Sequence, residues 1–146
     1  MKKLSFKVNI QAPASVVWHA LWDDTNYRTW THVFAEGSRA KSSWKEGDRI
    51  FFVDGNDDGM YSVIQKRVDN KEMVFTHLGI LSKGVELPPD EKSKDWEGAT
   101  EAYYLSEKDG ETELVTELSS TGDHVDYFKD TFPKALEIVK QIAEKA

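Results

Sequence analysis

Few residues in this chain have side chains suited to chemistry, and a histidine and a tyrosine stand out. His77 lies in a predicted strand, residues 72–78, whose alternation places it on the same face as Phe75. A histidine there could donate a hydrogen bond to a ligand carbonyl, or exchange a proton near neutral pH. Tyr104, in the predicted strand 99–106, is its candidate partner, since a buried phenol needs a hydrogen-bonding partner. The alternative is a histidine that only hydrogen-bonds to backbone.

An acidic segment, residues 54–59, resembles the first half of a calcium-binding loop. Oxygen-bearing side chains stand at Asp54, Asn56 and Asp58, and the glycine required at the sixth position is present. The twelfth position should be glutamate but is Gln65, and strands flank the segment where the motif needs helices. We interpret the segment as a hairpin turn, because a turn explains the same residues.

Other metal and covalent chemistry has little support in the sequence. The chain has no cysteine, which excludes disulfides, thiol catalysis and thiolate metal sites. No two histidines have zinc-ligand spacing, and no glycine-rich phosphate loop occurs. We therefore predict no metal site, no cofactor and no catalytic residue. The four histidines lie on different predicted elements: His19, His32, His77 and His124.

The charge of the chain limits its partners. Its formal net charge is −7, and no cluster of lysine and arginine is longer than two residues. A polyanion would be repelled, so neither nucleic acid nor an anionic membrane surface is an expected partner. No apolar stretch approaches the length of a membrane span, and we predict a cytoplasmic, soluble protein without membrane insertion.

The order of predicted elements begins with a strand at residues 4–10. Pro13 ends that strand and suits the first turn of the helix that follows at residues 14–22. A short second element reaches residue 30, and about six antiparallel strands come after it. The strands are predicted at residues 38–43, 48–53, 60–68, 72–78, 99–106 and 112–119.

A long helix at residues 123–145 closes the chain and must cover the sheet. Apolar residues recur there at three- and four-residue spacing, with Asp123 as a plausible N-cap. Pro133 is expected to kink this helix or to mark a boundary in it. Residues 79–98 show no periodicity, and their sequence leaves open whether they form an ordered lid or are disordered.

This order resembles the START/SRPBCC helix-grip superfamily, which includes polyketide cyclases and the birch-pollen allergen. The most similar group is named after the C-terminal domain of the activator of the heat-shock-protein-ninety ATPase. The resemblance covers essentially the whole chain. It is carried by packing motifs rather than catalytic ones, at residues 8–21, 27–30, 44–48, 59–64, 70–77 and 132–136.

The resemblance implies an α+β fold in one domain, residues 1–146, with the order β-α-α-β6-α. A curved antiparallel sheet of about seven strands would hold the long helix and leave an internal cavity. Most members of the superfamily hold a small molecule or lipid, so a small hydrophobic ligand is the leading functional hypothesis, without catalysis. A cyclase- or hydratase-like enzyme using His77 and Tyr104 is one alternative. A protein-binding module engaging a chaperone is the other.

The candidate ligand-binding residues are mainly aromatic and come from elements expected to face the cavity. Aromatic rings would supply apolar contact area, while His77 and Tyr104 would orient a polar end of the ligand. The chemistry of the ligand does not follow from these packing residues. The predicted set is Trp30, Phe34, Phe52, Phe75, His77, Tyr104, Phe128 and Phe132.

Overall fold

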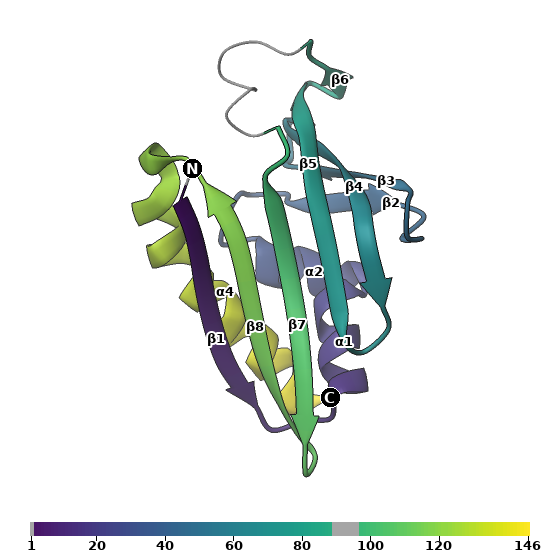
Figure 1. The fold of residues 1–146 in the computed structure, drawn as a ribbon, viewed down its shortest axis with the longest axis vertical. Coiled ribbons are helices and arrows are strands. Elements are labelled where there is room, and N and C mark those ends of the chain that lie inside the picture. The colour runs from purple at the N-terminus through teal and green to yellow at the C-terminus, as the bar shows by residue number, and fades with distance from the viewer. Residues whose placement is uncertain (1, 89–96) are drawn as a thin grey trace.

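The computed structural model describes residues 2–88 and 97–146 and has the α+β helix-grip architecture that the sequence predicts (Figure 1). The chain begins with β1 (Lys2–Ile10) and two helices, α1 (Ala14–Trp22) and α2 (Asp24–Thr31). The strands β2 (Arg39–Ser42), β3 (Arg49–Val53), β4 (Gly59–Val68), β5 (Glu72–Ser82), β6 (Val85–Glu86), β7 (Thr100–Lys108) and β8 (Glu111–Ser120) follow. A 3-10 turn, η1 (Gly122–His124), leads into α4 (Val125–Lys145).

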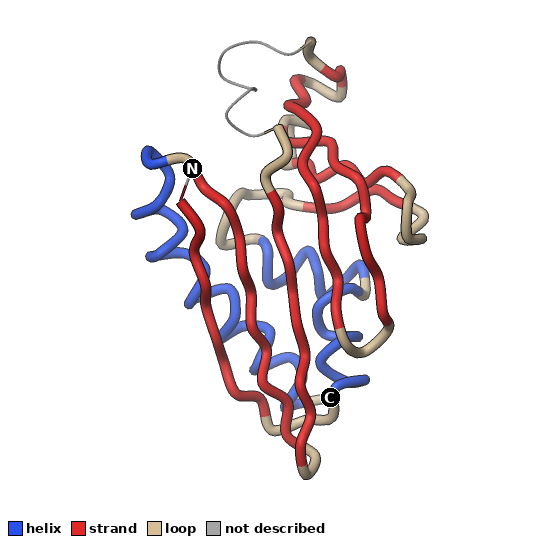
Figure 2. Tube along the Cα trace, viewed as in Figure 1, coloured by secondary structure: helices blue, strands red, loops and turns tan. Residues whose placement is uncertain are grey.

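The strands form one curved antiparallel sheet with the order β1-β8-β7-β5-β4-β3-β2, and the short β6 pairs with β5. The helices cover one face of this sheet, and the other face is bare (Figure 2). Helix α4 packs against β1 and against both shorter helices. The core therefore lies between the inner face of the sheet and the helices.

The last strand shows why the sheet has one dry face. Along β8 every second residue is buried, including Leu114, Thr116 and Leu118, while Glu113 and Glu117 face outward and are half-buried. Side chains in a strand alternate between the two faces, so this sequence can bury only one of them. The alternation of apolar and charged residues in the sequence predicts this buried face, and the structure confirms it.

The long helix differs from its prediction at its start and near its middle. Asp123 is not the N-cap, because residues 122–124 first form the 3-10 turn and His124 takes the capping position. Pro133 does not mark a boundary, since α4 is continuous through it. The ring of Pro133 is exposed, on the side of the helix away from the core.

Strand β5 is longer than predicted, running four residues past the expected end at residue 78. The pairing shifts register here, so that Ser62 lies opposite His77 and Tyr61 lies opposite Gly79. A Cβ at Gly79 would stand 2.4 Å from the hydroxyl of Tyr61, so any other residue there would force the Tyr61 ring to move. The predicted lid or disordered segment, residues 79–98, is thus strand at its start. Residues 89–96 lie outside the described residues.

Candidate functional site

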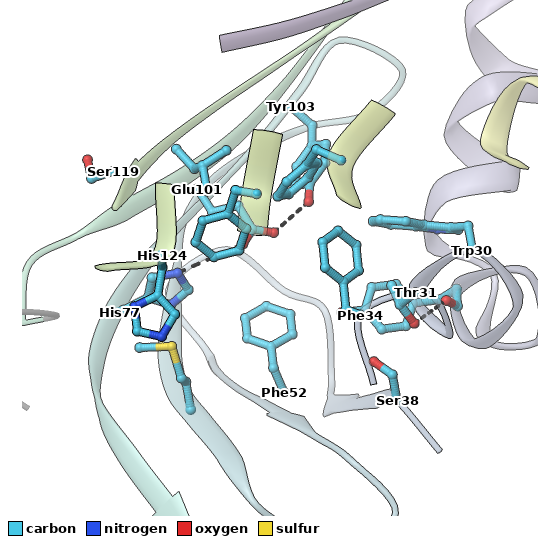
Figure 3. Close-up of a pocket in the computed structure, with 15 residues that line it drawn as sticks. Trp30, Thr31, Phe34, Ser38, Phe52, His77, Glu101, Tyr103, Ser119 and His124 are labelled. Carbon is cyan, nitrogen blue, oxygen red and sulfur yellow. Dashed lines mark hydrogen bonds and ion pairs between the residues drawn. The ribbon is translucent and has the colours of Figure 1, made fainter. Parts of the chain in front are cut away.

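A pocket of about 300 Å³ lies between the inner face of the sheet, α2 and the N-terminal half of α4 (Figure 3). Its deepest lining residues are buried, and those nearer the surface are partly exposed. Seven of them are apolar or aromatic without a polar atom beyond an indole N–H, and two tyrosines add aromatic rings, so the wall is mostly apolar. The full lining is Tyr27, Trp30, Thr31, Phe34, Ser38, Phe52, Met60, His77, Glu101, Tyr103, Leu118, Ser119, His124, Phe128 and Phe132.

The aromatic wall is held in place by ring packing and one buried hydrogen bond. Trp30 is 1% exposed, and its indole Nε1 donates to the carbonyl of Leu21 at 2.9 Å. Phe132 of α4 packs edge-on against Phe34, with ring centroids 4.8 Å apart. Edge-on ring pairs are favourable beyond the free energy gained by burying the rings, so this packing fixes the position of the wall.

A polar cluster lies at one end of the pocket, on β4, β5 and β7. Nδ1 of His77 and Oγ of Ser62 are 2.7 Å apart and hydrogen-bonded. The Tyr103 hydroxyl donates to Oε2 of Glu101 at 2.5 Å. Nε2 of His77 lies 3.9 Å from Oε1 of Glu101, too far for a hydrogen bond. Figure 3 shows His77, Glu101 and Tyr103 side by side at this end.

Burial dominates the electrostatics of this cluster. It lowers the pKa of His77 to about 4, so the imidazole is neutral at pH 7 and the contact with Glu101 is not an ion pair there. Burial also raises the pKa of Glu101, and the hydrogen bond from Tyr103 partly opposes that rise. The pKa of Tyr103 is raised by burial first and by the nearby charge of Glu101 second. The site therefore destabilises an isolated negative charge relative to water.

Six of the eight sequence-predicted residues lie around this one pocket. Phe75 does not: it is fully buried behind Phe52, with ring centroids 5.0 Å apart, and belongs to the core. A strand pattern identifies the inner face but not which inner residues border the empty space. The six that line the pocket are Trp30, Phe34, Phe52, His77, Phe128 and Phe132.

Tyr104 is on the opposite face of β7, and its predicted place beside His77 is corrected. A place for Tyr104 in the pocket requires Ala102 to face inward too, since residues two apart in a strand share a face, whereas Tyr103 and Glu101 face the pocket. Ala102 is buried on the outer face because it is small and lies between Val74 and Glu117 of the neighbouring strands. Leu105 is a larger apolar residue and is also buried. Its position correctly indicates that Tyr103 and Glu101, two and four residues earlier, face inward.

The acidic segment after β3 is a hairpin turn, as interpreted from the sequence. Oδ1 of Asp54 accepts hydrogen bonds from the backbone N–H of Asn56 and Asp58, at 2.8 and 3.1 Å. Asp57 forms an ion pair with Arg39. Within residues 2–88 and 97–146 no three histidine, aspartate or glutamate side chains gather as metal ligands would. Nor does any helix in this part of the chain have the length and apolarity to span a membrane.

The sequence comparison decides the family. The profile of the family described as "Activator of Hsp90 ATPase homolog 1-like protein" matches residues 11–144. The chain belongs to this family. The resemblance identified from the packing motifs is thereby confirmed. No curated protein matches the chain in sequence.

Solved structures show how widely the fold of this Hsp90-activator-like family is shared. Protein MLL2253 from Mesorhizobium loti has a TM-score of 0.75 at 14% identity, covering 99% of this chain and 98% of that one. The Aha1 dimer from Colwellia psychrerythraea has a TM-score of 0.73 at 17% identity, covering 99% and 97%. DynU16, from the dynemicin biosynthetic locus, has a TM-score of 0.73 at 15% identity and covers 99% of this chain. The chain spans about half of DynU16, 48%. Identities this low indicate a common fold alone.

Proposed function

We propose that the pocket binds a small hydrophobic ligand. The observation that carries this proposal is the composition of the pocket: an aromatic wall with a compact polar cluster at one end. Sites for small molecules are mostly apolar clefts of about 300–1,000 Å³ with a few polar groups that fix orientation. This pocket is at the small end of that range.

The energetics favour a ligand of modest affinity. Phe34, Phe52 and Phe128 line the pocket and are each only partly buried by the protein itself. A ligand that removes ~200 Å² of apolar surface from water gains ~5 kcal/mol, before the cost of losing its own freedom of motion. We therefore expect dissociation constants in the millimolar to micromolar range for simple aromatic probes.

The proposal is tested with tryptophol, a neutral indole alcohol, as the probe. Saturable binding is expected by isothermal titration, with a rise in the thermal midpoint. Ser38→Trp places a bulky ring at a lining position and should weaken tryptophol binding at least tenfold. Ser106→Trp, on an exposed position of β7 outside the lining, is the matched control and should leave binding unchanged. Equal binding by both variants would overturn the proposal.

An enzymatic role is the second candidate, and the contact between His77 and Glu101 favours it. A neutral imidazole and a carboxyl group with a raised pKa, 3.9 Å apart, could each exchange a proton with a substrate that lies against both groups. The pair replaces the combination of His77 with Tyr104 expected from the sequence. Loss of turnover on a polyketide-like substrate in folded His77→Gln would support this candidate. Absence of turnover in the unaltered protein would count against it.

A protein-binding role is supported by the family alone. The family description names an activator of the Hsp90 ATPase, and one similar structure is a dimer. Engagement of a chaperone, like the cytoplasmic location, therefore stays a prediction from the sequence. A pull-down from the source cell extract that recovers no stoichiometric protein would argue against the chaperone partner.

A further inference from the structure

We propose that the ligand carries a basic amine on an aromatic body, and that Glu101 binds this amine inside the pocket. The inference rests on the proposed function and specifies the class of ligand. It excludes fatty acids and other organic anions as the preferred occupants.

The charge of the lining is the first argument. Among the described residues that line the pocket, Glu101 is the one carboxylate, and there is no lysine or arginine. A carboxylate or phosphate headgroup would thus meet no fixed positive charge, and it would face Glu101 at short range. The net charge of −7 adds a field of the same sign across the whole chain. The charge of the lining and the net charge of the chain therefore both favour a cationic ligand.

The hydrogen-bonding capacity of Glu101 is the second argument. An ionised carboxylate has about four acceptor sites. Oε2 accepts one hydrogen bond, from Tyr103, while Oε1 lies beyond hydrogen-bonding distance of His77 Nε2. The side chain of Glu101 is 24% exposed, and the residue is part of the pocket lining. An ammonium group in the pocket can therefore reach a carboxylate oxygen with acceptor capacity to spare.

The surroundings of Glu101 supply the third argument. The titratable groups that face it are His77 from β5, Tyr103 from its own strand and Tyr27 from α2. None of these is a cation at neutral pH, so they supply no positive charge to pair with Glu101. Aromatic faces such as those of Trp30 and Phe52 also attract a cation. A charge that is largely removed from water is costly unless it is paired, and an amine ligand would relieve that cost.

The experiment compares three ligands with the same indole body and different charge: tryptamine, tryptophol and indole-acetate. Isothermal titration at pH 7 of the unaltered protein should give at least tenfold tighter binding for tryptamine than for tryptophol. Indole-acetate should bind more weakly than tryptophol. In Glu101→Gln the tryptamine preference should shrink to threefold or less, while tryptophol affinity changes little. Glu137→Gln, an exposed position on α4 with the same charge change, should keep the full preference.

The outcomes separate this inference from the function on which it rests. Tryptophol binding without a tryptamine preference, or a preference for indole-acetate, would overturn the amine assignment and leave the binding function standing. Absence of binding by all three ligands would overturn both. If Glu101→Gln does not fold, the order of the three affinities in the unaltered protein decides the matter.

Discussion

The Tyr103 hydroxyl donates a hydrogen bond to Oε2 of Glu101, two residues earlier on the pocket face of β7. Residues two apart in a strand share a face, so the strand itself brings the donor to its acceptor. This pair turns one end of an aromatic pocket into a polar site. The neighbouring residue, Tyr104, lies on the opposite face of β7 and can therefore serve as a control.

Removing the Tyr103 hydroxyl should change Glu101, whereas removing the Tyr104 hydroxyl should not. Tyr103→Phe deletes a hydrogen bond that lowers the pKa of Glu101, so that pKa should rise further. A hydrogen bond to a charged group is worth ~1.5–3 kcal/mol, and the free energy of unfolding should fall by about that amount. Carboxyl-carbon NMR titration and urea unfolding measure the two effects. Tyr104→Phe, on the opposite face, should leave the Glu101 titration unmoved.

Phe75 and Phe52 should respond differently to truncation, although both were expected in the site. Phe75 is fully buried in the core, so Phe75→Ala should lower the free energy of unfolding by about 3–5 kcal/mol. Phe52 borders the pocket and is partly exposed, so Phe52→Ala should cost less stability and weaken tryptophol binding. Chemical denaturation and titration measure both quantities. A larger stability loss in Phe52→Ala than in Phe75→Ala would contradict the assignment.

His77 should make the protein less stable on acidification. Its pKa falls from 6.5 to about 4 on folding, so the unfolded chain binds more protons between these two values. The free energy of unfolding therefore rises with pH across this window, by up to about 3 kcal/mol. Glu101 acts in the opposite direction: its raised pKa gives stability that is lost as the pH rises through that pKa. His77→Gln isolates the first effect.

Urea unfolding at several pH values tests this dependence. The loss of stability between pH 7 and pH 4 should be smaller in His77→Gln than in the unaltered protein by about 3 kcal/mol. His32→Gln, at an exposed position on the surface, is the matched control and should show the unaltered loss. Identical pH profiles for all three proteins would show that His77 is not buried as a neutral group.

The main elements of the fold were predictable from the sequence because they have a clear period. The alternation in β8 and the three- and four-residue spacing in α4 each allow one buried face. The errors fall where local rules compete. The chain makes a 3-10 turn before α4 in spite of a good capping residue at Asp123. Strand β5 continues through Gly79, where the Tyr61 ring fills the space that a side chain would take.

The site was harder to predict than the fold, for a reason that β7 makes plain. Ala102 is small enough to be buried on either face, so it is a poor guide to strand phase. Most glutamates are exposed, so the residue type of Glu101 does not mark it as a pocket residue. Its inward position follows only from the phase set by Leu105 and Tyr103. The shape of the pocket depends on which inner side chains leave space, which no periodicity encodes.

Contacts between tryptophol and the protein show whether the ligand occupies the aromatic pocket. Intermolecular NMR Overhauser effects measured at saturating tryptophol should join the indole protons to Phe52, Met60 and Phe132, which line the pocket together. Such effects are expected if tryptophol binds inside the pocket. Saturable binding with contacts only to outward-facing residues such as Tyr104, or no contacts to the pocket rings at all, would contradict it.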